Sequence, residues 1–77
     1  MEGFYEFRKA LYKRESGGKY NIKNKWGYLG AAQFGKERLW DLGLSVNGWK
    51  PKNGVVKKVI TEYQFLSNPE LQDAIFE

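Results

Sequence analysis

Apolar residues near the start of the chain recur with the spacing of a helix that has one apolar face. Phe4, Phe7 and Leu11 lie three and four positions apart, and charged residues fill most of the positions between them. This pattern predicts an amphipathic helix over about residues 4–16. The two glycines that follow are typical of a helix C-terminus, because glycine readily adopts the left-handed conformation found there.

The same apolar stripe, extended by one turn from Leu11, reaches Glu15. The sequence therefore predicts a carboxylate at the last inward-facing position of the first helix. Burial among apolar groups and the negative end of the helix dipole both favour the uncharged form of a carboxyl group.

The middle of the chain predicts a loop followed by a second helix. Residues 19–28 are polar, aromatic and interrupted by glycine, without a sustained period, which indicates a loop. Helical spacing returns over residues 29–43, which predicts a short turn of helix and then a second helix over about residues 36–42, whose apolar side carries Leu39 and Leu42.

Turn-forming residues are dense over residues 44–58, which predicts an irregular loop or at most a loose hairpin. Thr61 with Gln64 three positions later resembles a capping box and predicts a helical segment over residues 61–67. Asn68 and Pro69 then predict the N-cap and first residue of a last helix. Its expected inner face carries Leu71, Ala74 and Ile75.

These elements predict a mainly α fold of three to four helices with irregular loops, in a single domain over residues 1–77. Thirteen Lys and Arg against nine Asp and Glu give a net charge of +4, which suits an acidic polymer without identifying one. The chain has no Cys and no His, which excludes thiolate and imidazole chemistry. We expect neither a metal nor a cofactor, and proton transfer is left to carboxylates, Lys and Tyr.

Two short motifs at a defined spacing resemble a known enzyme family. Glu15-Ser16-Gly17-Gly18 closes the first predicted helix, and Gly30-Ala31-Ala32-Gln33 opens the next, with Gln33 eighteen positions after Glu15. This arrangement is similar to that of goose-type lysozymes and lytic transglycosylases. The stretch from Asn24 to Gly30, with Gln33-Phe34 after it, is most similar to phage and bacterial members, and residues 65–74 carry a weaker similarity.

The resemblance implies a lysozyme-like helical fold that cleaves glycosidic bonds in peptidoglycan or a similar acidic glycan. Glu15 would then be the general acid and base, and the product would be either a 1,6-anhydro sugar or a hydrolysed one. Ser16 would position the Glu15 side chain, while Gly30, Gln33 and Tyr28 would line the substrate groove. Family members act at the bacterial cell envelope or belong to phages, although the first residues do not form a signal peptide.

The sequence departs from the family pattern in one respect. The family has a later helix with an Ala-Tyr-Asn-like motif, and Glu62-Tyr63-Gln64 matches it poorly. We therefore expect that the chain corresponds to the N-terminal portion of such a domain, with an incomplete groove. Self-association is an open alternative for a domain of this size without disulfides.

Other interpretations stay open. The chain could be a non-catalytic glycan-binding or phage structural module of the same fold, while nucleic-acid binding ranks last because the basic residues are spread along the sequence. Glu15 could be a solvated helix-end carboxylate beside Arg14 or Lys19. Trp26 and Tyr28 could stack on sugars, but we expect large aromatics in so short a chain to be core residues. No apolar run approaches the roughly 20 residues that span a bilayer.

Overall fold

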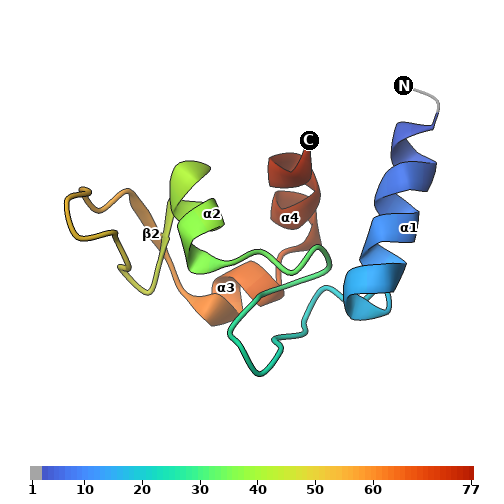
Figure 1. Cartoon of the computed structure of the whole chain (residues 1–77), viewed down its shortest axis with the longest axis horizontal. Coiled ribbons are helices and arrows are strands. Elements are labelled where there is room, and N and C mark those ends of the chain that lie inside the picture. The colour runs from blue at the N-terminus through green and yellow to red at the C-terminus, as the bar shows by residue number, and fades with distance from the viewer. Residues whose placement is uncertain (1–2) are drawn as a thin grey trace.

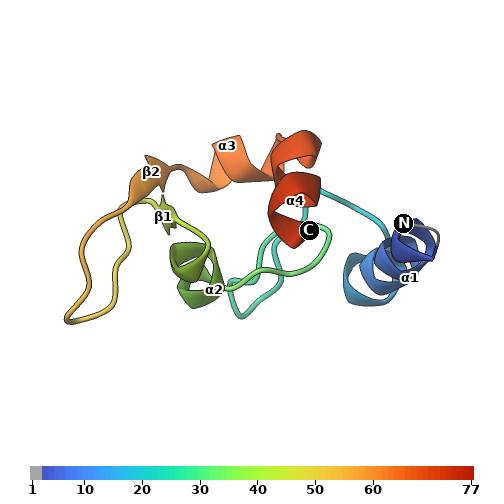
Figure 2. The ribbon, with the colours of Figure 1, turned by 90° about the horizontal axis from the view of Figure 1, so that it is seen from above.

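Four helices and one small parallel sheet make up the part of the chain described by this computed structural model, residues 3–77 (Figure 1). In chain order the elements are α1 (Phe4–Ser16), α2 (Lys36–Asp41), β1 (Leu44–Val46), β2 (Lys58–Ile60), α3 (Glu62–Leu66) and α4 (Pro69–Phe76). The molecule is elongated, with extents of 38 × 27 × 18 Å. Seen from above, α1 lies at one end and the loop between β1 and β2 at the other (Figure 2). The predicted mainly helical character is confirmed.

The first helix has the predicted bounds but not the predicted inner face. Gly17 and Gly18 close it by donating their backbone N–H groups to the carbonyls of Lys13 and Tyr12, at 2.9 and 3.0 Å. The buried residues are Tyr12 and Ser16, whereas Phe7 is 60% exposed. The buried face is therefore rotated away from the predicted stripe.

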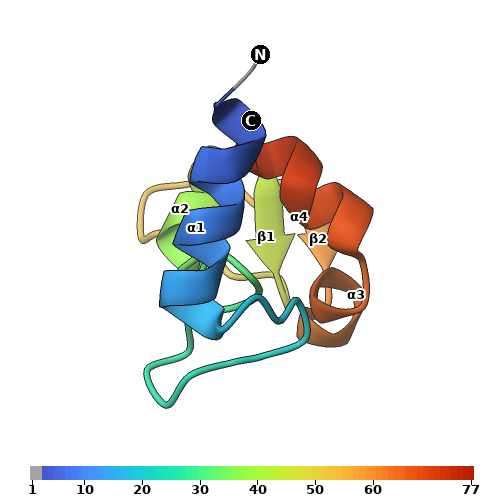
Figure 3. The ribbon, with the colours of Figure 1, turned by 90° about the vertical axis from the view of Figure 1, so that its right-hand side faces the viewer.

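The packing of α1 against α4 explains this rotation. The two helices run in opposite directions, so that Phe76 at the end of α4 packs on Phe4 and Tyr12 (Figure 3). The Tyr12 hydroxyl donates to Asp73 at 3.0 Å, which satisfies its polar end while its ring is buried. The rotation turns Glu15 outward, so the prediction that this carboxylate faces inward is wrong.

The starts of the two C-terminal helices match the sequence signals. Gln64 donates its backbone N–H to the Thr61 hydroxyl, and its side chain accepts from the Thr61 backbone N–H, both at 3.0 Å, so the capping box is confirmed. Asn68 caps α4 by accepting from the backbone N–H of Leu71. The expected inner face is only partly right, because Ala74 is exposed.

A two-stranded sheet replaces part of the loop predicted for residues 44–58. β1 and β2 pair in parallel, with Ser45 opposite Val59. The side chain of Ser45 is fully buried and accepts a hydrogen bond from the backbone N–H of Lys57 at 2.7 Å. Parallel pairing of two three-residue strands leaves no local hairpin signal, which explains why the turn-rich sequence predicted only a loop.

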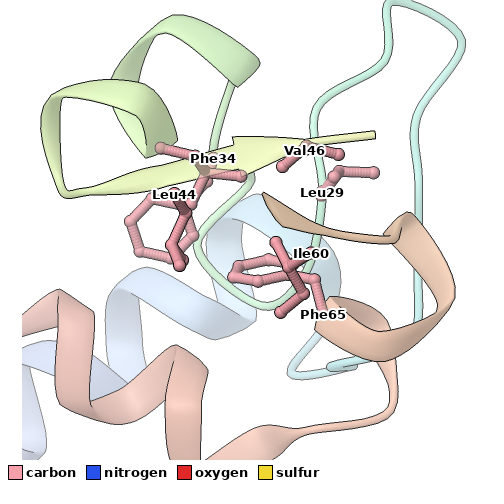
Figure 4. Close-up of a cluster of buried hydrophobic side chains, with 7 residues drawn as sticks. Leu29, Phe34, Leu44, Val46, Ile60 and Phe65 are labelled. Atoms are coloured by element: carbon pink, nitrogen blue, oxygen red, sulfur yellow. The ribbon is translucent and has the colours of Figure 1, made fainter. Parts of the chain in front are cut away.

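The hydrophobic core lies between the sheet, α2, α3 and the segment that precedes α2. Its buried members are Leu29, Phe34, Leu39, Leu44, Val46, Ile60 and Phe65. Figure 4 shows these side chains meeting beside the sheet, with the rings of Phe34 and Phe65 edge to face at 5.9 Å. None of these buried core residues comes from α1, which joins the molecule through α4.

No helix within residues 3–77 combines the length and the apolar character that crossing a bilayer demands.

Candidate functional site

The structure places the Glu15 carboxylate at the surface, near the C-terminal end of α1. Its side chain is 41% exposed, and its Oε1 atom lies 3.7 Å from Nε of Arg14, whose side chain is 72% exposed. Such a long contact between exposed groups contributes little to stability. Within the described residues the Glu15 carboxylate has no closer ion pair than this one, and it faces solvent.

Ser16 follows Glu15, but its hydroxyl group forms no hydrogen bond with the Glu15 side chain. The hydroxyl donates to the backbone carbonyl of Tyr12, one turn earlier, at 2.9 Å. Because the residue is buried, this bond satisfies a hydroxyl that water does not reach. The geometry assigns Ser16 to the packing of the helix end.

Gly30 and Gln33 form a tight turn rather than the first turn of a helix, since α2 begins at Lys36. The backbone N–H and the side-chain amide of Gln33 both donate to the Gly30 carbonyl, at 3.1 and 2.9 Å. Gln33 has a positive φ of 55°. In the described part of the chain, Gln33 and Glu15 share no hydrogen bond, so the structure does not join the two sequence motifs directly.

Gln72 of α4 fixes this turn, and the sequence analysis missed it. The residue is fully buried. Its Oε1 atom accepts from the backbone N–H of Ala31 at 2.9 Å, and its Nε2 atom donates to the carbonyls of Tyr20 and Phe65 at 3.0 and 2.9 Å. One side chain thus links α4 to the loop after α1, to the Gly30 turn and to the end of α3.

The close approach of Gly30 to Gln72 explains the glycine. Gly30 has a φ of 79°, and a Cβ atom there would overlap the Gln72 amide and press on the Phe65 ring. The sequence analysis allowed a close approach to either a ligand or a neighbouring helix, and the neighbour is a helix side chain. The Gln within the Asn-Pro-x-Leu-Gln run was the signal that could have indicated this contact.

Asp73, next to Gln72, holds the opposite side of α4 against α1. Its Oδ1 atom accepts from the hydroxyls of Tyr12 and Tyr20 at 3.0 and 2.9 Å, and its Oδ2 atom lies 3.8 Å from Arg8. Burial and, after it, the hydrogen bond to Asp73 raise the pKa of Tyr12 well above its ordinary value. The same two causes, in the same order, raise the pKa of Tyr20.

Trp26 and Tyr28 are exposed, at 73% and 46%, so the expectation that they are core residues is wrong. Both lie on the wall of an open cleft of about 760 Å³, which we call the aromatic cleft. It is bounded by the Trp26–Tyr28 loop, the first turn of α2 and the turn after β1, where Trp49 lies. None of Glu15, Ser16, Gly30 or Gln33 lines it.

A second depression, which we call the basic groove, lies along α1. Its side chains include Tyr5, Arg8, Lys9, Lys13 and Tyr20, and its volume is about 520 Å³. No carboxylate lines it. Glu15 therefore lies in neither depression of the described surface.

Within residues 3–77, no group of three or more Asp and Glu side chains is arranged to hold a metal ion. The carboxylates of Glu62 and Asp73 are instead engaged by side chains of the chain itself, Lys23 for the first and Tyr12, Tyr20 and Arg8 for the second.

Comparison with known proteins adds no relative, because no family model, no curated protein and no solved structure matches the chain.

Proposed function

We propose that this chain supplies part of a lysozyme-like site that cleaves the glycan strands of peptidoglycan, with Glu15 as general acid and base. The observation that carries the proposal is the position of Glu15, which opens the Glu-Ser-Gly-Gly motif at the C-terminal end of α1. Its ion pair with Arg14 is long, at 3.7 Å, so no strong partner has to be displaced before the carboxyl group meets a glycosidic oxygen.

Two other carboxylates have structural partners that a catalytic acid would have to give up. Glu62 lies 3.1 Å from the ammonium group of Lys23, and Asp73 accepts two tyrosine hydroxyls. Substituting Asp73 would leave those tyrosine hydroxyls without their acceptor, so its role in folding is clear. This contrast favours Glu15 over Glu62 and Asp73, whereas Glu15 differs from exposed carboxylates such as Glu6 and Glu37 by its place in the motif.

The chemistry implied by the family resemblance needs two proton transfers. The Glu15 carboxyl first gives its proton to the oxygen of the leaving sugar as the glycosidic bond breaks, with the N-acetyl group of the substrate assisting. The resulting carboxylate then takes a proton from the attacking hydroxyl. If this is the 6-hydroxyl of the same sugar the product is a 1,6-anhydro sugar, and if it is water the product is hydrolysed.

The exposure of Glu15 sets a condition on this reaction. A carboxyl group donates a proton efficiently near neutral pH only where its surroundings favour the protonated form, and water at the surface does not. Catalysis by Glu15 therefore requires the bound glycan, or a further protein surface, to cover the side chain.

The proposal is tested by incubating the protein with purified peptidoglycan and identifying the soluble products by mass spectrometry. Glu15→Gln should lower product release by at least about 100-fold, the usual contribution of a general acid. Glu6→Gln is the matched control, because Glu6 is an exposed carboxylate on the same helix. Equal product release by wild type and Glu15→Gln would eliminate Glu15 as the acid.

The same assay separates the proposal from the non-catalytic alternative. A non-catalytic glycan-binding module would sediment with insoluble peptidoglycan and release no soluble fragments. The aromatic cleft is the observation that favours this alternative, since it offers a binding surface that does not include Glu15.

A further inference from the structure

The aromatic cleft has walls that are fixed by the chain itself. Asn24 accepts hydrogen bonds from the backbone N–H groups of Trp26 and Tyr28 through its Oδ1 atom, at 2.9 and 3.0 Å. The backbone of Asn24 also donates to the Tyr28 carbonyl at 3.0 Å. One asparagine thereby holds a short loop that presents an indole and a phenol ring, so a ligand would not have to order this wall on binding.

A second part of the lining comes from the turn after β1. Trp49 donates its backbone N–H to the Val46 carbonyl at 2.9 Å, and the Lys36 ammonium group lies 5.3 Å from the centre of the Trp49 ring. Asn47, in the same turn, accepts from the backbone N–H of Glu62 at 3.3 Å. Aromatic rings thus border the cleft on two sides, with polar groups between them.

The side chains that line the cleft include equal numbers of positive and negative groups. Lys36 and Arg38 are positive, while Glu37 and Glu62 are negative. From outside the lining, Lys23 pairs with Glu62 at 3.1 Å, and the Lys25 ammonium group lies 4.6 Å from the centre of the Trp26 ring. Such a mixed surface attracts a polyanion less than the basic groove does, which is lined by Arg8, paired with Asp73, and by Lys9 and Lys13. The occupant that suits the aromatic cleft is uncharged, with apolar faces for the rings and hydroxyl or amide groups for the polar side chains.

We infer that the aromatic cleft is a binding site for an uncharged saccharide segment, distinct from the position of Glu15. A pyranose ring has C–H faces that pack on Trp26 and Trp49, while its hydroxyl and acetamido groups hydrogen-bond with side chains such as Glu37. The choice of an N-acetylated amino sugar rests on the proposed function. The volume of about 760 Å³ is large enough for a short oligosaccharide.

The test is a titration of the full chain with the β-1,4-linked tetramer of N-acetylglucosamine, followed by NMR. The three tryptophans provide an internal comparison. The indole N–H signals of Trp26 and Trp49 should shift, whereas that of Trp40, which is bonded to the Val55 carbonyl at 2.9 Å, should stay in place.

Two substitutions of exposed aromatics make a matched pair. Trp26→Ala should weaken binding by at least about tenfold, because an aromatic ring that packs on a sugar face carries much of the affinity. Tyr63→Ala should leave the affinity unchanged, since Tyr63 is 79% exposed and lies outside the cleft. Both residues are at the surface, so both variants should keep the far-ultraviolet circular dichroism spectrum of the wild type.

Three results would overturn the inference: no indole shift at about 10 mM tetramer, shifts confined to the basic groove, or equal affinity for wild type and Trp26→Ala.

Titration of Glu15→Gln separates this inference from the proposed function. If that variant binds the tetramer normally while peptidoglycan cleavage is absent from the wild type, the cleft stands and the catalytic proposal fails. If cleavage is present and Trp26→Ala binds the tetramer normally, only the cleft fails.

Discussion

Gln72 is the side chain whose replacement tests the architecture most directly. Gln72→Met keeps a similar length and shape but removes both the acceptor and the donors of the amide. The substitution leaves two backbone groups without their partner, the N–H of Ala31 and the carbonyl of Tyr20, while the Phe65 carbonyl keeps its bond from the Asn68 backbone N–H at 3.2 Å. Ala31 is fully buried, so water cannot replace the amide there.

The cost follows from these orphaned groups. Each buried polar group left without a partner costs about 1–3 kcal/mol, and the effects at one site are not fully additive. We therefore expect Gln72→Met to lower the free energy of unfolding by about 2–4 kcal/mol. That is a large fraction of the roughly 5 kcal/mol expected for a small domain, so the urea midpoint of the variant should fall markedly.

Gln64→Met is the matched control, because Gln64 is exposed and loses one capping hydrogen bond, to the Thr61 backbone N–H. Its expected cost is about 0.5–1 kcal/mol. Urea unfolding followed by tryptophan fluorescence gives both values from the midpoints and slopes. If Gln72→Met costs no more than Gln64→Met, the three hydrogen bonds of Gln72 do not hold the fold together as argued.

Two further predictions concern the Gly30 turn and the tyrosines beside α4. Gly18→Ala should lower the free energy of unfolding by about 1 kcal/mol, because the residue has a φ of 83° and open space around it. Gly30→Ala should lower it clearly more, because the new Cβ atom would also overlap Gln72. Equal urea midpoints for the two variants would contradict this. Because the folded-state pKa values of Tyr12 and Tyr20 are raised, their contribution to stability is complete below the ordinary value of 10.0 and is lost as the pH rises above it. The free energy of unfolding should fall above about pH 10 by up to about 1.4 kcal/mol per pH unit for each tyrosine, and Tyr20→Phe should make this decline less steep. An unchanged decline in that variant would refute the assignment.

Local side chains were sufficient to predict the helix ends. Thr61 with Gln64 and Asn68 with Pro69 act within one turn, so their effect on the backbone is independent of the rest of the fold. The sheet was not predicted, because Ser45 and Val59 are far apart in sequence and their pairing depends on the loop that brings them together.

The site was predicted less well than the fold, for the same physical reason. Tyr12 is buried in place of Phe7 because its hydroxyl has a partner in Asp73, sixty-one residues later. Gln72 is buried because backbone groups from three other segments satisfy its amide. A pattern of apolar residues cannot represent partners of this kind, so the orientation of Glu15 was predicted wrongly while its position at the end of the helix was predicted correctly.

The attachment of α1 has a consequence for any reaction at Glu15. This helix contributes none of the buried side chains of the central cluster. It is held by the hydrogen bond of Tyr12 to Asp73 and by the contacts of its rings with Phe76 of α4 and with Tyr20 of the following loop. Its separation from the body would break these contacts but leave the sheet and its neighbours folded, as in a local opening. The fraction of time for which Glu15 occupies its observed position would then depend on Asp73, Phe76 and Tyr20, none of which belongs to α1.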